Sequence, residues 1–182
     1  MNPTTLIAGI GNIFLGDDAF GSEVARRLLA RPWPESVKVV DFGIRGFDLM
    51  YALLEGYETV ILVDATPRGG APGTLYTIEA DLSELDCAAP GDAAFETHGM
   101  NPMRVLAAAK AMGARFGRIF VVGCEPAPES VDPDGPGVMG LSDAVRNAVD
   151  ESVRVIETLV ARTNNNRSML WEDSSRSQGA SS

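Results

Sequence analysis

The side chains best suited to chemistry are acidic, and most of them directly follow apolar segments of the chain. They are Asp17, Asp18, Asp41, Asp64 and Glu125. The sequence contains one histidine, His98, so any reaction that needs an imidazole from this chain must use that residue. Several carboxylates gathered at one place repel one another unless a cation or a proton relieves them. A site made from these residues therefore needs secondary-structure elements that bring them together.

Strand-like and helix-like segments alternate along the chain. The apolar runs are continuous, which is typical of parallel strands covered on both faces. The expected architecture is therefore α/β, with three α/β/α layers and a mostly parallel open sheet. Sites in such sheets form beyond the carboxyl ends of the strands, where these acidic residues lie. Strands are predicted at 4–10, 37–41, 59–64, 74–78 and 118–122, and helices at 20–30, 46–55, 101–112 and 141–161.

The length of 182 residues indicates one domain, which we place at residues 1–162. Residues 163–182 are polar and are predicted to form a disordered C-terminal tail, with Met169, Leu170 and Trp171 as a small docking patch. Asp17 or Asp18 is suited to cap the helix at 20–30, and Asn101 to cap the helix that starts at Pro102. Residues 80–98 and 124–140 are predicted to be long loops.

Composition excludes several classes of function. The formal charge of −10 disfavours nucleic acid as a partner. No apolar run reaches the roughly 20 residues of a membrane helix, and the N-terminus lacks the basic residues of a signal peptide. Cys87 and Cys124 are too few for a disulfide framework and are expected to be inert packing residues. A cytoplasmic protein is expected.

A dinucleotide site is the first alternative. Gly9 and Gly11 follow a strand and precede a helix, but the fingerprint needs glycine where the chain has Phe14. Asp17 and Asp18 would place two negative charges where the pyrophosphate should lie. A nucleotide- or metabolite-binding α/β module therefore stays an alternative hypothesis.

A metal site fits the residue types better. Two carboxylates and one neutral imidazole suit nickel, zinc, cobalt or manganese, and they balance the charge of a divalent ion. Asp64, His98 and either Asp17 or Asp18 are the candidates, and periodicity does not choose between the two neighbours. In the simpler interpretation, the Asp pair caps a helix, Asp41 turns the chain, and Glu125 caps or lines the rim.

Several short motifs, in this order and spacing, resemble those of one enzyme family. The opening Gly9-x-Gly11-Asn12, with Asp17-Asp18 and Gly21, resembles the signature of the nickel–iron hydrogenase maturation endopeptidases. The resemblance covers about residues 5–160. Its other motifs are Val63-Asp64-Ala65, Thr97-His98-Gly99, Gly123-Cys124-Glu125-Pro126 and Gly140-Leu141-Ser142.

The resemblance implies an endopeptidase that removes the C-terminal extension of the hydrogenase large-subunit precursor after nickel insertion. It implies that Asp18, Asp64 and His98 are both the metal ligands and the catalytic residues, so it chooses Asp18 over Asp17. Nickel would come with the substrate and be shared with the protease, and other divalent cations can substitute. Either the metal polarises the scissile carbonyl or a water, or a carboxylate is the general base. The precursor is the expected partner, and a monomer is favoured.

Two positions depart from the family pattern. Ala19 stands where many members have glycine, and Asp41 is followed by Phe42 and Gly43 where a second glycine is more usual. The second departure weakens any role for the turn at Asp41. A hydrolase of small substrates that uses the same metal rim is a third hypothesis, but the two long loops favour a protein-sized substrate.

Overall fold

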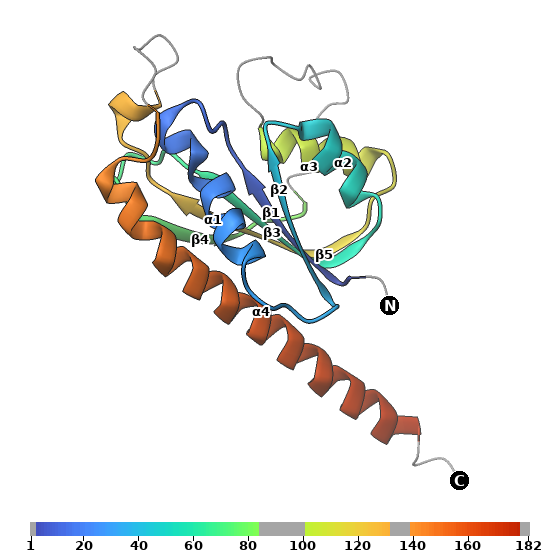
Figure 1. Ribbon diagram of the computed structural model, residues 1–182. Coiled ribbons are helices and arrows are strands. Elements are labelled where there is room, and N and C mark those ends of the chain that lie inside the picture. Colours follow the sequence, from blue (N-terminus) through green and yellow to red (C-terminus); the bar gives the residue numbers. More distant parts are fainter. Residues whose placement is uncertain (1–2, 84–100, 132–138, 179–182) are drawn as a thin grey trace.

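The computed structural model describes residues 3–83, 101–131 and 139–178, and the side chains as far as residue 163. A five-stranded sheet in the order β2-β1-β3-β5-β4 forms its centre (Figure 1). All neighbouring strands are parallel except β4, which runs antiparallel to β5. The mostly parallel open sheet predicted from the sequence is therefore confirmed. The strands are β1 (Thr5–Ile10), β2 (Val37–Gly43), β3 (Tyr57–Ala65), β4 (Leu75–Glu79) and β5 (Phe116–Cys124).

Helices cover both faces of the sheet. The helices α1 (Phe20–Leu29) and α4 (Asp143–Gln178) lie on one face, and α2 (Gly46–Leu53) and α3 (Pro102–Ala111) on the other (Figure 1). Successive side chains of a strand point to opposite faces. Thus Ile7 packs in the core under α1 and α4, while Leu6 and Ala8 pack under α2 and α3. The expected three layers are confirmed.

The two predicted helix caps have different outcomes. Asn101 caps α3, since its side chain accepts hydrogen bonds from the backbone N–H groups of Met103 and Arg104. Neither Asp17 nor Asp18 caps α1, so that prediction is wrong. A short 3-10 turn, η1 (Gly16–Ala19), precedes the helix, and the cap position is Ala19. Both aspartates lie inside this turn and are free to serve other partners.

The end of the chain also differs from the expectation. We predicted that the last helix ends near residue 161 and that a disordered tail follows, but α4 continues to Gln178. Its far end projects beyond the sheet (Figure 1). Residues 163–178 contain neither proline nor glycine, so no residue in this stretch interrupts a helical backbone, and Gly179 follows its last residue. No helix in the described part of the chain is both long and apolar enough to cross a membrane.

Two glycines set the distance between α1 and the sheet. A Cβ atom on Gly21 would collide with the backbone carbonyl oxygens of Ile10 and Val63. A Cβ atom on Gly9 would collide with Ala25 and with the carbonyl group of Gly21. The helix backbone therefore rests directly on the ends of β1 and β3. This contact fixes where the turn η1 lies relative to β3.

Candidate functional site

Asp18 and Asp64 come together at the carboxyl edge of the sheet. Asp64 is near the end of β3, and Asp18 lies in η1, which follows the neighbouring strand β1. The Asp18 Oδ2 atom accepts a hydrogen bond of 2.7 Å from the backbone N–H of Asn12. The pairing of β1 with β3 brings the two residues to the same edge, and the charge of Asp18 contributes to the raised pKa of Asp64. Chain elements 46 residues apart thus meet as the sequence predicted for Asp64 and one of the Asp pair.

Both carboxyl groups lie in an environment that disfavours charge. Asp64 keeps part of its surface exposed, but burial of its carboxyl group raises its pKa well above the ordinary value, and the nearby charge of Asp18 adds to this. Burial also raises the pKa of Asp18, against the opposing hydrogen bond from Asn12. Two like charges in a poorly solvated place cost free energy, and a cation between them would remove that cost. The pair therefore suits a divalent metal ion.

Asp17 accepts hydrogen bonds from other loops, a role that Asp18 does not share. Its side chain is fully buried. Its Oδ1 atom accepts a 2.6 Å hydrogen bond from the Ser142 backbone, and its Oδ2 atom accepts 2.9 Å bonds from the Ser142 hydroxyl and the Ala127 backbone. The backbone N–H of Asp17 donates to the Ser130 hydroxyl at 2.9 Å. Asp17 therefore joins three loops at the rim, and its oxygens are already in use.

Asp41 lies two residues before the end of β2 and holds the turn there. Its Oδ1 atom accepts bonds of 2.8 Å from the Ser22 hydroxyl and 3.0 Å from the Gly43 backbone. Gly43 has a φ of +56°, a conformation that favours glycine. The expectation that Asp41 turns the chain is confirmed. In the sheet, Gly9 of β1 lies between Asp41 of β2 and Val63 of β3, so Asp41 is separated from the Asp64 region by one strand.

Glu125 is a buried anchor for the loop that follows β3. Its carboxylate accepts hydrogen bonds from the backbone of Arg68 at 2.8 Å, the backbone of Gly69 at 3.0 Å and the hydroxyl of Tyr76 at 2.7 Å. Burial opposes the charge of Glu125, but these hydrogen bonds outweigh burial and hold its pKa below the ordinary value. Of the two roles expected for Glu125, capping of loop amides is the one that the structure shows. The sequence did not indicate Tyr76 as a partner.

We expect Glu125→Gln to lower the melting temperature near pH 7, because an amide cannot accept from all three donors. The Glu125 carboxylate, whose pKa is lowered in the folded protein, stabilises the fold fully when the pH is above its ordinary pKa of 4.5. This stabilisation is lost as the pH falls through the lower pKa of the folded state. The difference in melting temperature between wild type and variant should therefore shrink below about pH 4.5. Thermal unfolding followed by circular dichroism across pH checks this. An equal difference at acidic and neutral pH would contradict it.

Cys124 is a packing residue, as the sequence predicted. Its side chain is 1% exposed, and burial, with the charges of Asp17 and Glu125, raises the pKa of its thiol to about 12. The thiolate fraction at neutral pH is then about a thousandfold smaller than for an ordinary thiol with a pKa of 9.0. Cys87 lies outside the described residues.

In a Cys87→Ser variant, Cys124 should not react with Ellman's reagent at about pH 8 until the protein is unfolded. Absorbance measured in buffer and then in guanidinium chloride checks this, because the same sample supplies its own control. Rapid reaction of the folded variant would show that this thiol is accessible and ionisable.

The three metal ligands implied by the sequence motifs are Asp18, Asp64 and His98. His98 lies outside the described residues, which omit 84–100 and 132–138. Within residues 3–83, 101–131 and 139–178, no group of three histidine, cysteine or acidic side chains could hold a metal ion. The described chain therefore supplies two of the three proposed ligands, Asp18 and Asp64.

Sequence reasoning missed the partners of Asp17. Ser142 was visible only as part of the motif Gly140-Leu141-Ser142, and Ser130 carried no signal at all. In the structure this motif binds the Asp17 side chain, since the backbone N–H and the hydroxyl of Ser142 both donate to Asp17.

Comparison with known proteins identifies the family. The family model described as hydrogenase maturation protease matches residues 22–159 of the chain. The chain belongs to the hydrogenase maturation protease family. It is therefore a protease, and the expectation from the sequence motifs is confirmed. The family assignment disfavours the alternative of a nucleotide-binding module.

Relatives of this protease occur in bacteria and archaea. Hydrogenase expression/formation protein HupD of Rhodobacter capsulatus is 34% identical over 151 residues, which is 80% of this chain and 70% of the relative. The hydrogenase 2 maturation peptidase of a Thaumarchaeota archaeon is 29% identical, with a TM-score of 0.65 and coverage of 86% and 97% of the two chains. The hydrogenase maturating endopeptidase HybD of Escherichia coli is 24% identical and shares the fold, with a TM-score of 0.67 and coverage of 90% and 94%.

Proposed function

We propose that this protease removes the C-terminal extension of a nickel–iron hydrogenase large-subunit precursor after nickel has been inserted. The observation that carries the proposal is the pair Asp18 and Asp64 at the carboxyl edge of a maturation-protease fold. A cation relieves the repulsion between two neighbouring carboxylates. In this proposal the cation comes bound to the precursor. The large-subunit precursor is the partner, and nickel is part of the substrate.

The three proposed ligands would act together on the nickel of the precursor. Asp18 and Asp64 supply oxygen donors, and His98 supplies one neutral nitrogen donor, a set that suits nickel and other divalent cations. With so few strong donors, the protease alone holds free metal weakly, so a productive complex forms only with loaded precursor. Cleavage follows either through polarisation of the scissile carbonyl or a water by the metal, or through a carboxylate as general base.

The proposal is tested with His98→Ala and Asp18→Asn, each assayed for processing of the nickel-loaded precursor. We expect both variants to lose activity, because each removes one ligand of the shared ion. Asp48→Asn is the matched control, since Asp48 is exposed on α2 and pairs with Arg45. Full processing by both site variants would refute the site.

Thermal shift separates this proposal from the alternative of a nucleotide- or metabolite-binding module. Stabilisation by NAD or ATP, without any response to nickel, zinc or cadmium, would favour the module. The monomeric state and the cytoplasmic location stay predictions.

A further inference from the structure

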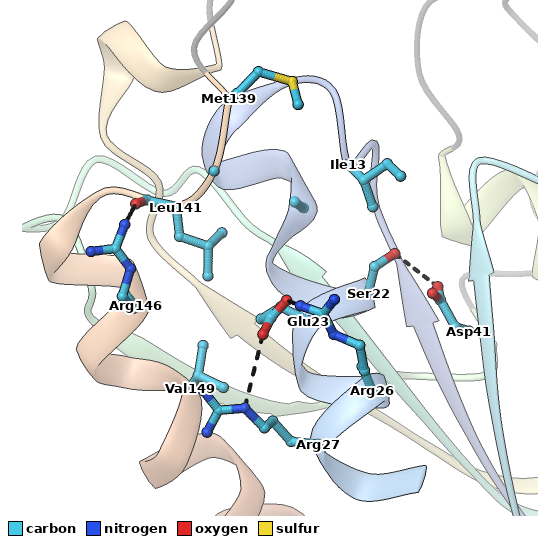
Figure 2. Close-up of a pocket in the computed structure, with 12 residues that line it drawn as sticks. Ile13, Ser22, Glu23, Arg26, Arg27, Asp41, Met139, Leu141, Arg146 and Val149 are labelled. Carbon is cyan, nitrogen blue, oxygen red and sulfur yellow. Dashed lines mark hydrogen bonds and ion pairs between the residues drawn. The ribbon is translucent and has the colours of Figure 1, made fainter. Parts of the chain in front are cut away.

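A pocket of about 520 Å³ opens between α1 and the start of α4 (Figure 2). Residues of α1, of the loop after β1 and of the start of α4 surround it. Its volume falls in the range of about 300–1,000 Å³ that is usual for ligand pockets. None of the roles described above for Asp18 and Asp64 uses this space.

The pocket combines apolar walls with an exposed apolar mouth. Leu141 and Val149 lie in its wall and are 8% and 1% exposed. Ile13 and Met139 also line it but are 55% and 73% exposed, and Figure 2 shows both above the pocket. When another apolar group covers the large apolar side chains at the mouth, the free energy of the system falls because apolar surface leaves water. The pocket therefore suits an apolar side chain.

Arg26 is the charged side chain of the pocket best placed to pair with an anion, because Arg27 also pairs with Asp150 and Arg146 pairs with Asp143. Three guanidinium groups, those of Arg26, Arg27 and Arg146, line the pocket with two carboxylates, Glu23 and Asp41, although the whole chain carries a charge of −10. Both carboxylates already have donors: Glu23 pairs with Arg26 and Arg27, and Asp41 accepts from Ser22. A guanidinium group has five N–H donors. Among the described residues Glu23 is the one ion-pair partner of Arg26, so most donors of that side chain are available to a ligand.

The pocket is within reach of a peptide bound at the proposed site. Ala19 of the lining directly follows Asp18. Asp41 lies two strands from Asp64, and neighbouring strands are about 4.8 Å apart, so about 10 Å separates these strand ends. Three residues of extended chain cover about 10 Å. Because Ala19 both follows Asp18 and lines the pocket, a substrate segment that passes Asp18 would bring a nearby side chain to the pocket.

We propose that this pocket binds the precursor segment that flanks the scissile bond, through an apolar side chain and an adjacent acidic side chain. The apolar group contacts Leu141, Val149 and the mouth residues Ile13 and Met139, and the acidic group pairs with Arg26. The inference rests on the proposed function, since it names the feature of the same substrate that the protease recognises. The pocket contributes to substrate binding and takes no part in bond cleavage.

The test uses two variants that change one property each. Arg26→Gln removes the positive charge, and Ile13→Gln removes the apolar group at the mouth. Both side chains are largely exposed, so the fold should persist. The matched controls are Arg154→Gln, on the exposed side of α4, and Leu29→Gln, which is 55% exposed like Ile13 but lies outside the pocket.

Steady-state processing of nickel-loaded precursor and direct binding of that precursor are both measured. We expect Arg26→Gln to raise KM about fivefold and Ile13→Gln about threefold, with kcat changed less than about twofold and both controls like wild type. Unchanged KM and unchanged precursor affinity in both pocket variants would overturn the pocket while the proposed function stands. If the wild type binds precursor in an Arg26-dependent way but never cleaves it, the proposed function fails and the pocket stands.

Discussion

Replacement of Asp64 by Asn should reduce processing of the nickel-loaded precursor by at least about 100-fold, because the variant loses a negatively charged oxygen ligand for the shared ion. The free energy of unfolding should stay the same or rise, since the variant removes one of two neighbouring carboxylates that repel each other. A processing assay followed on denaturing gels, with urea unfolding of the same preparation, measures both quantities.

This combination of results separates a functional residue from a structural one. Lower activity with lower stability would indicate that Asp64 mainly supports the fold. Asp48→Asn is a suitable control, because Asp48 is an exposed aspartate of α2 that pairs with Arg45 and lies outside both the site and the pocket. We expect this control to keep most of the activity.

Replacement of the adjacent residue, Asp17, by Ala should have the opposite effect on stability. The variant leaves the Ser142 backbone, the Ser142 hydroxyl and the Ala127 backbone without their acceptor in a fully buried place. Each buried donor without a partner costs about 1–3 kcal/mol, so we expect a loss of about 3 kcal/mol or more in the free energy of unfolding. Urea unfolding measures the loss, and Asp18→Asn is the matched control.

The variants Asp17→Ala and Asp18→Asn are expected to differ in whether they change stability or activity. Asp17→Ala is expected to lower stability strongly, with activity lost as the rim loops come apart. Asp18→Asn is expected to lower activity at nearly constant stability. Equal stability of the two variants would contradict the anchoring role of Asp17.

The sheet and its helices could be predicted from the sequence because their signals are local. The continuous apolar run 59–64 lies within β3, and the Asn101-Pro102 pair marks the start of α3. Asp41 and Asp64 could be placed at one edge for the same reason, since parallel strands end together.

The role of Asp17 could not be predicted, because its partners are remote in the chain. Ala127 and Ser142 are 110 and 125 residues away, and no local pattern links them to Asp17. An acidic pair before a helix looks like a cap, and only the fold shows that the pair lies inside η1 and that Ala19 takes the cap position of α1. The extension of α4 was missed because its polar composition says little about whether a helix continues.

The glycine contacts under α1 have a consequence for how sequences of this kind can diverge. The spacing of Asp18 and Asp64 depends on main-chain atoms of Gly21 that touch Ile10 and Val63. No side chain lies between these backbone atoms, so a change in side-chain size cannot alter the spacing there. Core residues elsewhere can therefore gain or lose methyl groups while the two acids keep their separation, because main-chain contacts set it.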